Sequence, residues 1–348
     1  MSTFTLFGLG LPELCGAAML LALVLYVLLG GADFGGGFWD LFATGPRKRA
    51  QRALIEDVIG PVWEVNHIWL ILIVVLLFSC FPRAFAVVTT ALHVPLTVML
   101  VGIVLRGAAF AFRQYDDRRD EVQRRWGRIF AMASIVTPIF LGVSLGAITA
   151  GGIRVDVDLV HGIDTVTTGF FASWLGVFPF MCGLFALVLF AFLAAVYLTN
   201  ETEDRALQDD FRRRALVAGV LAGVVAAGAW TTATAGAHGF GERLFHSSWS
   251  LPLQVVTGAA ALAAFAALAT RRFRLARAAA IVQTALIVLG WGLAQRPFLV
   301  VPDLTLRETA APAATLVAVL IALVAGTALL LPALVWLIRT FRVRRRPG

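Results

Sequence analysis

The chain contains nine apolar stretches that are each long enough to cross a lipid bilayer. A membrane helix needs about 20 apolar residues to span a hydrocarbon core of about 30 Å. The predicted segments are 12–30, 63–81, 86–112, 128–151, 174–198, 215–235, 251–270, 276–297 and 312–338. Hydrocarbon cannot satisfy open backbone groups, and no alternating barrel pattern is visible, so each segment is predicted to be a helix. The sequence therefore predicts an all-α, polytopic membrane helix bundle.

Composition excludes a soluble globule of this size. Of the 348 residues, 59% are apolar and only 14% are charged. This leaves too little polar side-chain surface to cover a soluble domain. The longest predicted connections, 31–62, 152–173 and 298–311, are too short to bury cores of their own. We therefore expect residues 1–348 to form a single membrane domain.

Basic residues gather in alternate connections of the chain. If the first segment runs from outside to inside, the cytoplasmic connections and the C-terminal end hold most of the 29 lysines and arginines. The outer connections hold only Arg83, Arg154, Arg243, Arg296 and Arg307. The positive-inside rule then places the N-terminus outside and the C-terminus in the cytoplasm. The net charge of +8 is split among short loops without interleaved aromatics, so the expected partner is anionic lipid, not nucleic acid.

The second segment opens with polar side chains. Trp63, Glu64, Asn66 and His67 follow a Gly-Pro pair that marks a helix start, and Glu64 and His67 share one helix face. Ionisable residues in a membrane segment are functional candidates. A low dielectric favours the neutral carboxylic acid, so Glu64 is a candidate proton carrier with His67 or a water as neighbour. The alternative, weighed equally, is that Glu64 lies at the interface and hydrogen-bonds the helix start.

A metal site is not indicated by the sequence. Di-iron bundles need two Glu-x-x-His motifs plus two further glutamates, and only one such motif is present here. The remaining histidines are scattered over different segments and loops: His93, His161, His238 and His246. The cysteines lack C-x-x-C spacing and lie in or near apolar segments: Cys15, Cys80 and Cys182. We therefore expect no metal and no haem on this chain.

Arg106 lies deep within the third predicted segment. An arginine there cannot face lipid without a heavy cost, so it needs a partner inside the bundle. Asp33 is the predicted partner, because it precedes the triplet Gly35-Gly36-Gly37, which lets another backbone approach closely. We expect this pair to be structural, and a role in a charge path is the alternative.

These motifs resemble those of subunit II of the cytochrome bd-type quinol oxidases. The resemblance is carried by 31–37 (GADFGGG), 59–71 (IGPVWEVNHIWLI), 81–85 (FPRAF) and 102–110 (GIVLRGAAF). It covers the first third of the chain closely, whereas the remainder matches mainly in helix number and topology. Members of the cyanide-insensitive subgroup are also similar.

The resemblance implies a haem-free subunit that partners a haem-bearing subunit I in the bacterial cytoplasmic membrane. Together they would reduce oxygen to water with quinol and contribute to the proton motive force, with haems b and d in subunit I. It also implies that Glu64 lines a proton path and that Asp33 and Arg106 form a buried polar pair. Some members carry a second acid where this chain has Leu29, which argues against a proton route through that position. Some members also hold a structural quinone or route oxygen through this subunit, and a small accessory subunit is a further candidate partner.

Two other classes of membrane protein share some of these features. A secondary transporter typically has broken segments at corresponding positions of two halves, whereas the buried charges here crowd into the first three segments. A membrane scaffold would tolerate Glu64→Gln as long as assembly is preserved. A proton-path subunit would not.

Overall fold

The computed structural model describes residues 9–59, 63–115, 120–158, 163–237 and 239–344. The helices are α1 (Leu11–Leu41), α2 (Lys48–Ile59), α3 (Trp63–Cys80), α4 (Pro82–Ala91), α5 (His93–Tyr115), α6 (Asp120–Ala150), α7 (Val177–Leu198), α8 (Arg205–Gly236), α9 (Phe240–His246), α10 (Ser250–Ala269), α11 (Phe273–Gln295) and α12 (Ala313–Arg344). Two antiparallel hairpins pair β1 (Val155–Asp158) with β2 (Ile163–Val166) and β3 (Phe298–Val300) with β4 (Leu304–Thr305).

The predicted all-α membrane bundle is confirmed. Within the described ranges, 8 helices are long and apolar enough to cross a membrane, or up to 9 if the bent pair of α3 and α4 counts as one span. The predicted membrane segments correspond to α1, α3, α5, α6, α7, α8, α10, α11 and α12. The predicted orientation of the termini stays a prediction.

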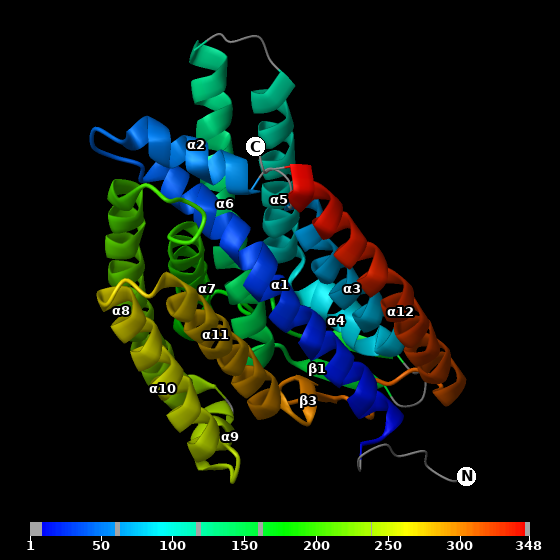
Figure 1. The fold of residues 1–348 in the computed structure, drawn as a ribbon. Coiled ribbons are helices and arrows are strands. Elements are labelled where there is room, and N and C mark those ends of the chain that lie inside the picture. Colours follow the sequence, from blue (N-terminus) through cyan, green and yellow to red (C-terminus); the bar gives the residue numbers. More distant parts are fainter. Residues whose placement is uncertain (1–8, 60–62, 116–119, 159–162, 238, 345–348) are drawn as a thin grey trace.

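Helix α1 forms the centre of the bundle. It contacts α3, α6, α7 and α11, whereas Leu21 and Leu29 on its remaining face are exposed. Figure 1 shows α1 running diagonally through the middle, with α12 along one edge and α8 and α10 along the opposite edge. Side chains on α1 are therefore the ones best placed to contact several helices at once.

The first membrane helix is longer than predicted, because it continues to Leu41 instead of ending near residue 30. Glycine destabilises an isolated helix, so the glycine triplet on its own predicts a loop between helices. In the structure this part of α1 packs on α7, where a Cβ on Gly35 would lie 1.9 Å from the carbonyl oxygen of Phe190. The Trp39 indole N–H also donates to the Ala191 carbonyl at 2.7 Å. The close backbone approach predicted from the glycines is therefore present.

The predicted segment 86–112 is divided between α4 and α5. Pro95 lies in the first turn of α5, and its ring would clash with the carbonyl of Ala91 if one helix ran through. Helix α4 accordingly ends at Ala91, whose free carbonyl accepts a hydrogen bond from Ser173 Oγ at 2.8 Å. The preceding break has a similar cause, because Pro82 disfavours helical backbone at Phe81, and α3 and α4 meet at 120°.

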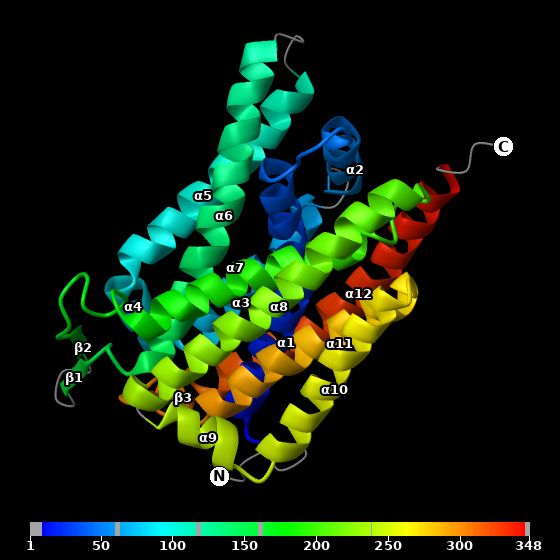
Figure 2. The same ribbon diagram turned by 90° about the vertical axis from the view of Figure 1, so that its left-hand side faces the viewer.

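Hairpins and short elements close one end of the bundle. In Figure 2, β1 and β2 lie beside α4, and α9 lies at the same end, while α5 and α6 project beyond the other helices at the opposite end. Arg154 Nε pairs with Asp303 Oδ2 at 2.9 Å. This ion pair joins the residue before β1 to the turn between β3 and β4. Arg307 pairs with Glu13 at 2.5 Å and fixes the second connection to the start of α1.

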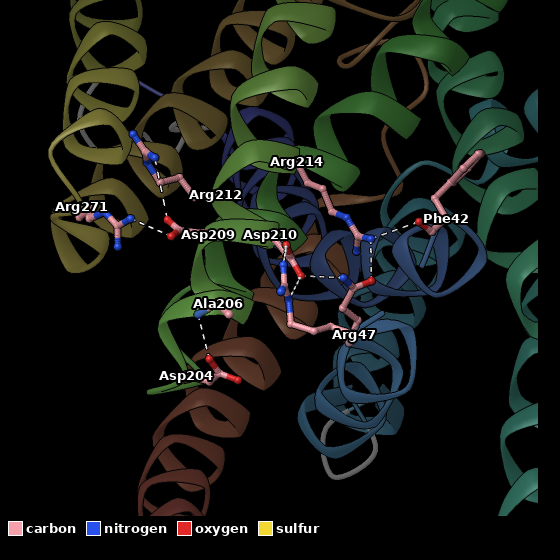
Figure 3. Close-up of polar contacts among 10 residues, drawn as sticks. Phe42, Arg47, Asp204, Ala206, Asp209, Asp210, Arg212, Arg214 and Arg271 are labelled. Carbon is pink, nitrogen blue, oxygen red and sulfur yellow. Dashed lines mark hydrogen bonds and ion pairs between the residues drawn. The ribbon is translucent and has the colours of Figure 1, made fainter. Parts of the chain in front are cut away.

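Ion pairs organise the end of the bundle that the sequence predicts to be cytoplasmic (Figure 3). Arg47 pairs with Asp210 at 2.6 Å, and Arg271 pairs with Asp209 at 2.7 Å. The hydrogen bonds that Arg47 donates to Asp210 raise the pKa of the Arg47 guanidinium. Asp204 caps α8 by accepting the Ala206 N–H at 2.8 Å. These contacts fix α2 and the α10–α11 turn to the start of α8, which is helical well before residue 215.

Candidate functional site

A buried acid and an amide meet between α1 and α3. Asp33 and Asn66 are only 5% and 6% exposed. The Asn66 amide donates to Asp33 Oδ2 at 2.5 Å, and it also approaches the Leu29 carbonyl at 3.5 Å. Buried carboxyl groups need hydrogen-bond donors of this kind, because an unsatisfied charge in a low dielectric is costly. The structure therefore brings together two residues that the sequence assigned to different roles.

Arg106 is held by α5 within a shell of aromatic and hydroxyl groups. Its side chain is 1% exposed, and its Nε donates to Ser134 Oγ on α6 at 3.2 Å. The guanidinium carbon lies 4.7 Å from the ring centroid of Phe34 and 5.1 Å from that of Phe130. Cation–π contacts of this type gain strength when they are desolvated. The cation is therefore sandwiched between α1 and α6.

Asp33 and Arg106 lie in the same buried centre without touching. Their opposite charges attract each other. No hydrogen bond and no nitrogen–oxygen contact within 4.0 Å joins these two described side chains directly. The attraction therefore acts without a direct contact between the two side chains, and its contribution to assembly stays a prediction.

Two glycines make room for the hydroxyl groups of α6. A Cβ on Gly37 would lie 2.1 Å from Ser134 Oγ, the atom that accepts the Arg106 hydrogen bond. A Cβ on Gly102 would lie 2.2 Å from Thr137 Oγ1. A side chain at either position would therefore displace one of these hydroxyl groups. We name the set Asp33, Asn66, Arg106, Ser134 and Thr137, together with Tyr26, the buried polar centre.

His67 lies beside this centre in aromatic surroundings. Its ring centroid is 5.8 Å from that of Phe34 and 6.1 Å from that of Tyr26. Trp63 and Glu64 belong to the first turn of α3, but their side chains fall outside the described part of the chain. A contact between Glu64 and His67 therefore stays a prediction.

The other histidines do not join this centre. His93 Nδ1 lies 3.0 Å from the Thr90 carbonyl, and His246 belongs to α9. His161 and His238 lie outside the described residues. Among the residues that the structure covers, no group of three His, Cys, Asp or Glu side chains could hold a metal ion. The expectation that the chain binds no haem stays a prediction.

Sequence reasoning missed a second buried acid on α1. Asp40 is 4% exposed, and its Oδ1 lies 3.5 Å from Arg52 Nε on α2. The available signal was its spacing of seven residues from Asp33, which places both acids on one face of α1. Tyr26 stands seven residues before Asp33 on the same face and was also missed.

Comparison with known proteins identifies the family. Residues 11–341 match the family model for cytochrome bd terminal oxidase subunit II, so the chain belongs to this family. The putative cytochrome bd menaquinol oxidase subunit II of Bacillus subtilis (strain 168) is 24% identical over 295 residues, which cover 82% of each chain. These matches confirm the predicted membership.

Two further relatives match over shorter stretches. Subunit 2 of the cytochrome bd ubiquinol oxidase of the same B. subtilis strain is 32% identical over 143 residues, covering 40% of this chain and 41% of that protein. Subunit 2 of the cytochrome bd-I ubiquinol oxidase of Escherichia coli (strain K12) is 26% identical over 181 residues, covering 52% and 46%. The aligned part of this chain thus spans less than half of either relative.

The fold also matches a solved structure over nearly its whole length. A chain of the bd oxidase from Geobacillus thermodenitrificans aligns with a TM-score of 0.78 and 22% sequence identity, covering 95% of this chain and 98% of that chain. At this identity the similarity shows a shared fold.

Proposed function

We propose that this chain is the haem-free subunit II of a quinol:oxygen oxidoreductase in the bacterial cytoplasmic membrane. The observation that carries the proposal is the family match over residues 11–341, which covers the candidate membrane spans found in the described residues. In the reaction, two quinols and one dioxygen give two quinones and two waters. Haems b and d on the partner subunit would supply the electron transfer from quinol to oxygen, and the complex would contribute to the proton motive force.

The haems belong to a partner, the haem-bearing subunit I. The described histidines support that assignment, because His67 contacts Tyr26 and Phe34 whereas His93 contacts Phe170 and the Thr90 carbonyl. His67 is packed among aromatic rings, while His93 and His246 belong to α5 and α9. Such an arrangement suits neither paired axial ligation nor a metal cluster. A small accessory subunit and a quinone held as a structural ligand are further candidate partners, without assigned residues on this chain.

The buried polar centre has two roles in this proposal. Asp33 and Arg106 stabilise the packing of α1 against α3, α5 and α6. Glu64, Asn66 and His67 line a proton path that enters from the cytoplasmic side beside Trp63. The support for the second role is the position of Asn66, which joins α3 to the carboxylate at the bundle centre. Leu29 is 40% exposed and offers no titratable group, so the path does not use that position.

Purification of the tagged chain in mild detergent tests the proposed partnership. We expect a haem-bearing membrane protein to co-purify, with absorption bands of b- and d-type haems. After the partner is removed by a harsher detergent, this chain should retain no haem. Stoichiometric haem on this chain alone, or recovery of the chain without any haem protein, would overturn the proposal.

Substitution of Glu64 tests the proton path against a pure scaffold. Glu64→Gln removes the titratable group but keeps size and hydrogen-bonding capacity, so haem content should stay near normal while quinol-driven oxygen consumption slows. Glu64→Asp should recover part of the rate. The matched control is Glu203→Gln, which alters an exposed acid before α8. Equal turnover of Glu64→Gln and Glu203→Gln across pH would place Glu64 at the interface as a helix-start residue.

A further inference from the structure

Three buried polar atoms in the centre have no protein hydrogen-bond partner. They are Oη of Tyr26, Nη2 of Arg106 and Oγ1 of Thr137. The three residues are 0%, 1% and 0% exposed. A buried donor or acceptor that stays unsatisfied destabilises the protein, and an unsatisfied charged group destabilises it more. Three such atoms, on α1, α5 and α6, therefore point to a bound polar ligand.

The three atoms belong to one neighbourhood. The ring of Tyr26 lies 6.1 Å from that of His67, which lies 5.8 Å from that of Phe34. The Arg106 guanidinium lies over this Phe34 ring at 4.7 Å. Thr137 faces Gly102, which lies one helical turn before Arg106 on α5. The ligand therefore lies between the carboxylate and the guanidinium, two charges that attract without a direct contact.

Charge and hydrogen-bond chemistry select the ligand class. The guanidinium of Arg106 only donates, the carboxylate of Asp33 only accepts, and the hydroxyls of Tyr26 and Thr137 do both. An added anion would leave the centre with a net negative charge, because Asp33 and Arg106 already balance each other. Water is small, neutral, and both donates and accepts, so it alone satisfies all four groups.

We propose that a small cluster of bound water molecules links Asp33 to Arg106 and is held by Tyr26 and Thr137. The cluster satisfies the free Nη2 of Arg106 and carries the interaction between the two charges. It also extends the polar contacts from Asn66 on α3 to α6. This inference concerns the structure of the centre and holds independently of oxidase activity.

Hydroxyl-radical footprinting with X-rays in ¹⁸O-labelled water tests the cluster. Radicals formed from bound water oxidise adjacent side chains even where bulk solvent does not reach them. We expect Tyr26 to be oxidised at least tenfold faster than Phe192, which is 2% exposed and lies in an apolar cluster. The sample is the full-length protein as isolated from membranes in mild detergent. Its haem spectrum reports the proposed partnership separately. Equal oxidation of Tyr26 and Phe192 would overturn the proposal.

A matched pair of variants tests whether the water cluster reaches Thr137 on α6. Thr137→Val removes one hydroxyl at constant size and should lower Tyr26 oxidation several-fold. The control is Thr232→Val, whose hydroxyl bonds only to carbonyls of its own helix α8, and it should leave Tyr26 oxidation unchanged. Unchanged oxidation in Thr137→Val would contradict a cluster that reaches α6. A change on replacing chloride by gluconate would show an anion in place of water.

Discussion

Replacement of Gly35 by alanine should force α1 and α7 apart. The added Cβ would lie 1.9 Å from the Phe190 carbonyl oxygen and 2.7 Å from the Ala194 Cβ. Carbon and oxygen atoms ordinarily approach no closer than about 3.3 Å, so the helices must separate by roughly 1.4 Å. A backbone carbonyl cannot rotate away as a side-chain tip can. Overpacking costs about 1–3 kcal/mol, and we expect about 3 kcal/mol here because the backbone must move.

The gain in helix propensity partly offsets this cost. Alanine favours a helix interior over glycine by about 1 kcal/mol, which leaves a net loss of about 2 kcal/mol, or roughly thirtyfold in the unfolding equilibrium. Titration with SDS in mild-detergent micelles, followed by tryptophan fluorescence, measures this shift. The control is Gly223→Ala on α8, where an added Cβ meets nothing within 4 Å. This variant should leave the stability of the protein unchanged or raise it. Equal unfolding midpoints for the two variants would refute the tight α1–α7 contact.

The remaining predictions concern single contacts. Arg106→Leu should lower the amount of assembled complex more than turnover per complex, because Asp33 is left as an uncompensated buried charge. The double variant with Asp33→Asn should lose less assembled complex than the sum of the losses in the two single variants. Simple additivity of these losses would disprove the coupling between Asp33 and Arg106. Ser173→Ala should destabilise the protein by about 1–3 kcal/mol in the same SDS titration, since the last carbonyl of α4 loses its donor. Trp39→Phe should cost a similar amount by removing the donor to α7, and an unchanged midpoint would show that water replaces it.

The membrane segments could be predicted because they depend on local properties of the chain. Apolar length and the need to satisfy backbone groups decide where a helix crosses a membrane. The end of α1 and the break between α4 and α5 differ from the prediction, because the first depends on a distant partner and the second on a single proline. Gly35 is compatible with a helix here because α7 packs against it. Pro95 was visible in the sequence, but proline is also tolerated within membrane helices, so it did not by itself indicate the break after α4.

The candidate site could be predicted only in part. Asp33, Asn66 and Arg106 stood out because ionisable and amide side chains are rare in apolar segments. Ser134 and Thr137 gave no such signal, since hydroxyl side chains are common in membrane helices and bond to their own backbone. Their contacts with α5 depend on how the helices rotate about their axes, and packing sets that rotation.

Oxygen uptake by membranes from a strain that lacks this chain tests the central claim most directly. Reintroduction of the full-length chain should restore both d-type haem absorption and quinol-dependent oxygen consumption, because the proposed complex assembles only when both subunits are present. Reintroduction of Arg106→Leu should restore both only weakly and in equal proportion. If membranes without the chain keep their d-type haem and consume oxygen with quinol at the full rate, the chain is not a required subunit of the oxidase.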